Sequence, residues 1–139
     1  ASNRMRPMIL SRLFISCLSL CLTGTAPASA EETVPVMVGG ESTLDACGTL
    51  GAVTGLDPQG DNTLTVRNGP GTRYAATDFL PPDREVWICD QTGEWFAVVY
   101  AADGQTECNV SSPQAERAVY DGPCSAGWVF GRYVTILAG

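Results

Sequence analysis

The chain has 139 residues, of which 45% are hydrophobic and 17% charged, with fifteen acidic residues, eight arginines and no lysine or histidine. A formal net charge of −7 excludes the basic surface that nucleic-acid binding needs, and it disfavours contact with anionic lipid surfaces. Such a chain instead attracts neutral or cationic partners by long-range electrostatic steering.

The first thirty residues have the three-part layout of a secretory signal peptide. Three arginines precede an apolar run of about ten residues, and Ala28-Ser29-Ala30 supplies the small residues of a cleavage site. A transmembrane anchor would need a longer run to cross a bilayer core of about 30 Å. A lipoprotein signal would have to use Cys17 or Cys21, which fits less well because Leu20 is bulky.

We therefore expect residues 1–30 to be removed, with 1–4 lying upstream of the start of translation. The mature chain would be periplasmic or secreted, with no membrane insertion after cleavage. It would contain five arginines and fifteen carboxylates, a net charge of −10.

Downstream, residues 31–47 have no hydrophobic period and are predicted to be a flexible lead-in to a domain at 48–139. Short strands are predicted at 48–56, at 63–68 where Leu64 and Val66 alternate with polar residues, and at 85–90 and 94–100, which a glycine-containing turn joins as a hairpin. A polar loop at 101–126 separates them from "GWVFGRYVTIL" at 127–137, where two short strands are interrupted at Gly131-Arg132. No segment has a sustained helical period.

Four cysteines lie beyond the signal peptide: Cys47, Cys89, Cys108 and Cys124. An even number in a small exported chain is typical of disulfides, whereas a zinc site would need closely spaced cysteines or a histidine, and this sequence has neither. Because Cys108 and Cys124 bracket the polar loop, we pair them with each other, which leaves Cys47 with Cys89. No metal or other cofactor is expected.

Five short strands with turn signals between them predict an all-β fold, either a small antiparallel barrel or a sandwich. A structureless loop as long as 101–126 is unusual in a compact domain. A disulfide at its base makes it acceptable, since the bridge removes much of the entropy of closing the loop.

Three segments, in order, resemble bacterial SH3-type (Src homology 3) domains. "LTVRNGPGTRY" at 64–74 is similar to the family's leucine–x–valine–arginine–x–glycine–proline motif. "FLPPDREVWICDQTGEWFAVV" at 79–99 is similar to its second block, and "GWVFGRYVTI" at 127–136 to its closing block. The resemblance implies a five-stranded antiparallel SH3-like barrel over 48–139, with the disulfide-clipped insertion loop at 101–126.

The resemblance also implies a peptide groove lined by Trp95 and Tyr133, with Tyr74 as a third aromatic residue. The alternatives are that Trp95 is a core residue and that Tyr74 only holds the long loop in place. Planar aromatic side chains suit such a surface because they offer rigid apolar area at a low entropic cost. The sequence has Thr65-Val66-Arg67 where eukaryotic relatives have a pair of tyrosines. Phe130 takes the place of the proline of the closing turn and is the fourth residue expected to bind ligand. Trp87 and Trp128 lie within predicted strands and are expected to be packing residues.

No arrangement of residues indicates an enzyme. Ser-His-Asp and Cys-His sites need histidine, which is absent, and the spacing of the carboxylates selects no acid–base pair. We therefore expect a monomeric, non-catalytic binding module. The resemblance implies that it recognises peptidoglycan stem peptide. Two alternatives remain: an acidic interaction module or inhibitor that docks a basic envelope protein, and a purely structural domain whose loop at 101–126 is the variable part.

Overall fold

The computed structural model describes residues 24–25 and 31–139, so the predicted signal peptide lies almost wholly outside the described part. Strands and one short 3-10 helix make up the described regular structure. They are β1 (Met37–Val38), β2 (Glu41–Asp45), β3 (Thr49–Val53), β4 (Leu64–Arg67), β5 (Ala76–Leu80), β6 (Glu85–Thr92), β7 (Trp95–Tyr100), β8 (Pro113–Gln114), β9 (Ala118–Val119), β10 (Ser125–Phe130), η1 (Gly131–Tyr133) and β11 (Val134–Ala138).

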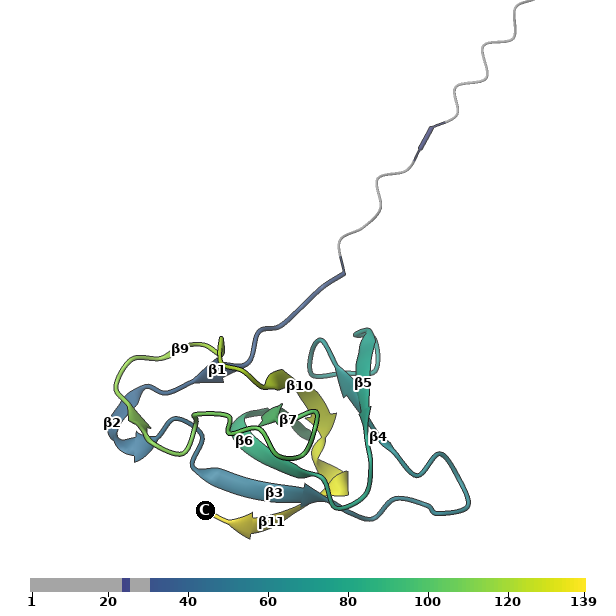
Figure 1. Cartoon of the computed structure of the whole chain (residues 1–139). Helices are drawn as coiled ribbons and strands as arrows, with labels where there is room; N and C mark the ends of the chain where they lie inside the picture. The colour runs from purple at the N-terminus through teal and green to yellow at the C-terminus, as the bar shows by residue number, and fades with distance from the viewer. Residues whose placement is uncertain (1–23, 26–30) are drawn as a thin grey trace, which may run out of the picture.

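Seven strands form one curved antiparallel sheet in the order β11-β3-β6-β7-β10-β4-β5, and β1-β9 and β2-β8 form two small sheets (Figure 1). The predicted all-β, antiparallel fold is confirmed. The predicted number of five strands is wrong. Residues 76–80 add β5 as the hairpin partner of β4. The two short strands predicted at 127–137 are present as β10 and β11, separated by η1. The sheet formed by the described residues is not a closed barrel.

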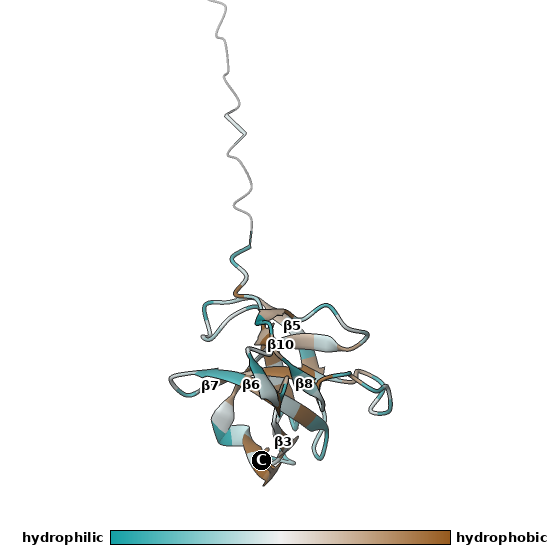
Figure 2. Cartoon of the chain, turned by 90° about the vertical axis from the view of Figure 1, so that its left-hand side faces the viewer, coloured by the Kyte–Doolittle hydropathy of each residue, from teal (hydrophilic) through white to brown (hydrophobic). Residues whose placement is uncertain are grey.

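The hairpin of β6 and β7 lies at the centre of the sheet, as its sequence predicted. Gly93 has a φ of +58° in the turn between the two strands, a conformation that glycine adopts without steric cost. Hydrophobic residues lie mainly within the strands, whereas the loops are largely hydrophilic (Figure 2). Residues 97–100 of β7 are all buried, so this strand is covered on both of its faces.

One face of the sheet encloses an inner cluster of hydrophobic residues. Alternate residues of β7 point into this cluster because side chains of a strand alternate between the two faces. Its buried members are Val53, Leu64, Val66, Leu80, Val86, Val98, Tyr100 and Val129.

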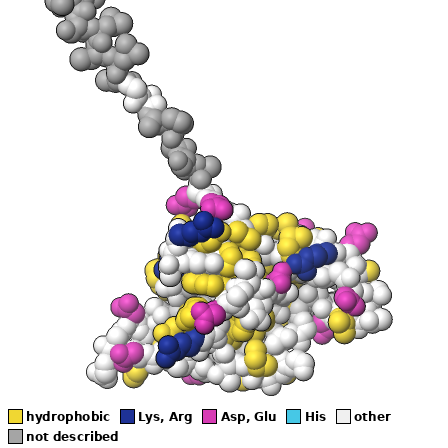
Figure 3. Space-filling model, turned by 180° about the vertical axis from the view of Figure 1, so that it is seen from behind, with side chains coloured by type: hydrophobic (Ala, Val, Ile, Leu, Met, Phe, Trp, Pro, Cys, Tyr) yellow, Lys and Arg dark blue, Asp and Glu magenta, His cyan; other side chains and the backbone are white. Residues whose placement is uncertain are grey.

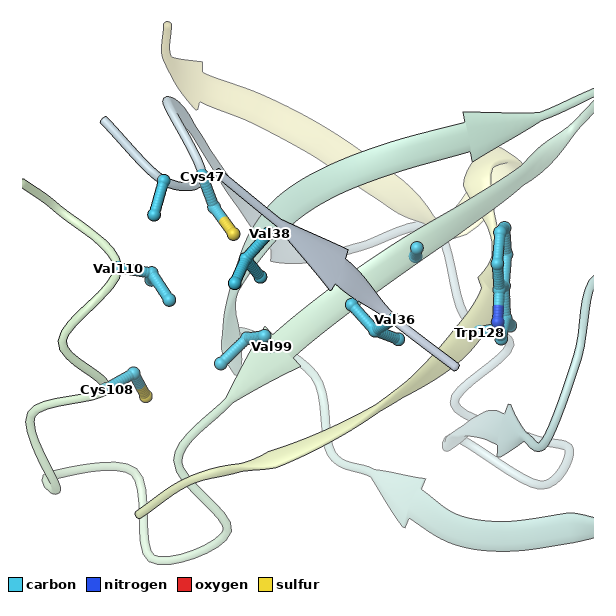
Figure 4. Packing of buried hydrophobic residues seen from close by; sticks show 9 residues of the cluster. Val36, Val38, Cys47, Val99, Cys108, Val110 and Trp128 are labelled. Atoms are coloured by element: carbon cyan, nitrogen blue, oxygen red, sulfur yellow. The ribbon is translucent and has the colours of Figure 1, made fainter. Parts of the chain in front are cut away.

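The opposite face is covered by a second, outer cluster that the sequence did not predict. Ala97 and Val99 of β7 and Trp128 of β10 meet side chains of the segment at 34–47, which we call the N-terminal strap, and of the loop at 101–126 (Figure 4). The buried members are Val36, Val38, Ala46, Cys47, Ala97, Val99, Cys108, Val110 and Trp128.

The N-terminal strap differs from the predicted flexible lead-in. It contains β1 and β2, and Met37 of β1 is aligned with Val119 of β9 in the loop at 101–126. The backbone N–H of Val34 donates to the carbonyl oxygen of Asn68 at 2.7 Å, and the Trp128 indole Nε1 donates to the Val34 carbonyl oxygen at 2.8 Å. The loop was predicted to lack structure. It is instead ordered by the strap, since each segment supplies the strand partner of the other.

Both predicted disulfide pairings are present. Cys47 is bonded to Cys89, which joins the end of the strap to β6, and Cys108 is bonded to Cys124, which joins the two ends of the loop. The packing roles predicted for Trp128 and Trp87 also agree with the structure, because Trp128 is buried in the outer cluster and Trp87 packs against it.

Tyr100 is a buried polar side chain of the inner cluster. Its hydroxyl group donates to Asp78 Oδ2 at 2.9 Å and so links β7 at the sheet centre to β5 at the sheet edge. Burial and this hydrogen bond raise the pKa of the Tyr100 hydroxyl group well above its ordinary value. The folded protein therefore keeps this hydroxyl protonated at a pH where an unfolded chain would lose the proton.

We expect Tyr100→Phe to reduce the loss of stability at alkaline pH. A pKa raised by folding contributes stability that is fully present below the ordinary tyrosine pKa of about 10 and is lost as the pH rises further. Urea unfolding between about pH 9 and pH 12 should therefore show a shallower decline for Tyr100→Phe than for the wild type. Tyr133→Phe is the control for loss of a hydroxyl group elsewhere. If the free energy of unfolding declines equally with pH for the wild type and Tyr100→Phe, the raised pKa of Tyr100 is contradicted.

Candidate functional site

A groove of about 620 Å³ lies at one end of the sheet, beside the turn between β10 and β11. Its volume is within the range of about 300–1,000 Å³ that is typical of ligand sites. Three segments of the chain line it, namely the loop at 56–63, strand β4 and the turn at 71–72. Three aromatic residues from other elements complete the lining. The lining residues are Leu56, Asp57, Asp61, Asn62, Thr63, Leu64, Thr65, Arg67, Gly71, Thr72, Trp95, Phe130 and Tyr133.

The aromatic residues form a continuous row along the groove. The ring centroids of Trp95 and Phe130 are 5.5 Å apart, and those of Phe130 and Tyr133 are 6.1 Å apart, with tilted planes in both pairs. Trp95 and Phe130 are adjacent because β7 and β10 are aligned so that these two residues are paired. The turn of η1 then brings Tyr133 to the other side of Phe130. All three side chains are half-buried, so their faces remain available to a ligand.

Backbone hydrogen bonds hold this row in place. The N–H of Gly131 donates to the carbonyl oxygen of Glu94 at 2.8 Å, and the N–H of Thr54 donates to the carbonyl oxygen of Tyr133 at 2.9 Å. A side chain at Gly131 would have its Cβ 3.0 Å from the Glu94 oxygen and 3.0 Å from the ring of Phe96. Glycine therefore avoids two tight contacts where β10 turns closely around the start of β7.

Three of the four residues predicted to bind ligand thus come together: Trp95, Phe130 and Tyr133. Tyr74 does not line the groove. Its side chain is only 6% exposed and packs beneath Gly69, where a Cβ would collide with the tyrosine ring. The Arg73 guanidinium lies 4.7 Å from the ring centroid of Tyr74 and donates to its hydroxyl oxygen at 2.8 Å. Tyr74 supports the turn that forms one wall of the groove.

Sequence reasoning missed the charged residues of the groove. Asp57 and Asp61 are exposed in the loop at 56–63, and Arg67 is half-buried on β4. Arg67 Nη1 donates to the Tyr74 carbonyl oxygen at 2.9 Å, which holds the turn at 71–74 against β4. A sequence signal for the aspartates existed, because "DPQGDN" is a cluster of turn-forming residues directly before the strand of the first SH3-type motif.

The lining of the groove suits non-covalent contact with a ligand. Aromatic faces, threonine hydroxyl groups and two carboxylates line it. Within residues 24–25 and 31–139, no group of three Asp, Glu, Cys or His side chains is placed to hold a metal ion. The same described residues contain no helix that is long and apolar enough to span a bilayer. Comparisons of the chain with family models, with curated proteins and with solved structures found no match.

Proposed function

We propose that this chain is an exported, non-catalytic binding module of the SH3 type, which holds an extended peptide in the groove along Trp95, Phe130 and Tyr133. The observation that carries the proposal is the aromatic row itself. Its members come from β7, β10 and η1, and their ring centroids are 5.5 and 6.1 Å apart. Rigid aromatic faces are common anchors for peptide ligands, because they bury much area while losing little side-chain entropy.

The topology of the central strands supports the SH3-type assignment. Strands β6, β7 and β10 follow one another as neighbours, and the first and last strands of the domain, β3 and β11, pair with each other beside β6. That order suits a five-stranded barrel to which β4 and β5 are added as a long hairpin. Export is supported by the two disulfides, which form and persist in oxidising compartments such as the periplasm or the extracellular space.

The ligand we propose is peptidoglycan stem peptide, the class that the resemblance to bacterial SH3-type domains implies. A groove of about 620 Å³ is large enough for several residues of an extended peptide. Asp57 and Asp61 at its rim would favour free amino groups of such a peptide over its carboxylates.

A second candidate is an acidic interaction module that docks a basic envelope protein. It is favoured by the excess of ten carboxylates over arginines in residues 31–139. On the face shown in Figure 3, acidic side chains are scattered over the surface, at its margins and beside the hydrophobic side chains of the middle. Association driven by this charge should weaken strongly as the salt concentration rises, whereas binding along the aromatic row should be much less sensitive.

Trp95→Ala is expected to weaken binding to purified peptidoglycan by at least about 2 kcal/mol, or roughly 30-fold, because it removes the largest apolar surface of the groove. Co-sedimentation of the domain at 31–139 across a salt series measures this. Leu137→Ala is the matched control, since Leu137 is 54% exposed on β11 and does not line the groove.

Retention of the wild type at high salt, with loss in Trp95→Ala alone, would support the peptide groove. Retention only at low salt, with equal behaviour of both variants, would favour the basic partner. No retention at any salt concentration would refute peptidoglycan as the ligand.

A further inference from the structure

Phe79 on β5 is an exposed aromatic residue that the groove described above does not include. Its side chain is 59% exposed, while its neighbour Leu80 is almost completely buried in the inner cluster. Phe79 is the cross-strand partner of Thr65 on β4, and paired residues of an antiparallel sheet point to the same face. Because Thr65 lines the groove, Phe79 lies on the groove side of the sheet.

The strand register places Phe79 beside the groove, next to Thr65. Trp95 is paired with Phe130 across β7 and β10, and Trp128 is paired with Arg67 across β10 and β4. Trp95, Phe130 and Thr65 line the groove from these three neighbouring strands. Phe79 follows on β5, the strand beyond β4.

The spacing of this row gives the reach that a ligand would need. Neighbouring strands lie about 4.8 Å apart, so the path over the sheet from Trp95 to Phe79 crosses three strand intervals, or about 14 Å. An extended peptide advances about 3.3 Å per residue, so at least four or five residues are required to touch both ends. Phe79, the cross-strand partner of Thr65, is the exposed aromatic residue at the far end of this path.

We propose that Phe79 is a second anchor for the ligand, which crosses β4 from the groove and places a further apolar or planar group against this side chain. The inference rests on the proposed function, since it assumes that the groove holds a peptide. It specifies the ligand as a chain longer than a single tripeptide, such as two stem peptides joined by a cross-link.

The test compares two probes purified from digested peptidoglycan, a single stem tripeptide and a cross-linked stem-peptide dimer, by isothermal titration calorimetry. Phe79→Ala should weaken binding of the dimer about 3- to 10-fold and leave the tripeptide unchanged, because the tripeptide cannot span from Trp95 to Phe79. Trp95→Ala should weaken both probes, and Leu137→Ala neither. Since Phe79 is exposed, the thermal midpoint of Phe79→Ala should stay close to that of the wild type.

Unchanged binding of the dimer to Phe79→Ala would overturn the second anchor and leave the groove intact. An equal loss for both probes would also overturn it, because it would indicate a disturbance of the groove and not a contact at its far end. Failure of the wild type to bind either probe would overturn the peptide function as well as the anchor.

Discussion

Replacing Cys47 and Cys89 together by alanine is expected to lower the free energy of unfolding by about 4 kcal/mol. The bridge closes a segment with a sequence separation of 42 residues, and the chain-entropy treatment gives about 3 kcal/mol for a 15-residue loop and about 4.7 for a 100-residue loop. Cys47 is 1% exposed in the outer cluster, so loss of its packing acts in the same direction. The strap should lose its covalent attachment to β6 and separate more easily from the sheet.

Urea unfolding of the double variant at neutral pH measures this effect. The comparison is a second double variant, in which Cys108 and Cys124 are replaced by alanine. The bridge that it lacks has a sequence separation of only 16 residues, so the expected loss in the free energy of unfolding is about 3 kcal/mol. Hydrogen exchange should show increased opening at 34–47 in the first variant and at 101–126 in the second. If neither variant shifts the unfolding midpoint, the bridges do not restrict the unfolded chain as described.

Trp128→Ala is expected to lower the free energy of unfolding by about 3–5 kcal/mol, the usual cost of truncating a buried tryptophan. Trp128 is 3% exposed and packs between the sheet and the N-terminal strap (Figure 4). Its Nε1 donates to the Val34 carbonyl oxygen at 2.8 Å, so the substitution also removes a direct link to the strap. The cavity and the lost hydrogen bond should together loosen the whole outer cluster.

Trp128→Phe separates these two contributions, since it keeps an aromatic ring but removes the donor. We expect a loss of about 1–2 kcal/mol for this variant, from the hydrogen bond and the smaller ring. Chemical denaturation with far-UV and near-UV circular dichroism is the measurement. Leu137→Ala, on the exposed face of β11, should change stability by less than about 0.5 kcal/mol. A small effect of Trp128→Ala would mean that the strap contributes little to stability.

The central strands could be predicted because their apolar residues follow a local pattern. Leu64 and Val66 alternate with polar residues on β4 and point into the inner cluster, and the hairpin of β6 and β7 is marked by its apolar runs and Gly93. Strand β5 was missed, because most of its residues are exposed and only Leu80 is fully buried. Its position at the sheet edge depends on pairing with β4 and not on a pattern of its own.

The strap and the loop at 101–126 could not be predicted for a different reason. Strands β1, β8 and β9 have two residues each, too few to produce any period. Met37 is paired with Val119 about eighty residues along the chain, so neither segment contains the information that it will be a strand. One signal was present but unused: the continuous apolar run of β7 indicates burial on both faces, which requires something to cover the second face.

Sequence alone thus determined the class of fold and the disulfide pairing, because they depend on local residue patterns and on a small set of cysteines. The resemblance to bacterial SH3-type domains indicated the three aromatic residues that line the groove. Tertiary structure decided which side chains meet. It turned Tyr74 into a buried support, opened the groove to Asp57 and Asp61, and covered the outer face of the sheet with the strap. The reason is physical: strand pairing and burial are made between distant segments, whose register no local pattern records.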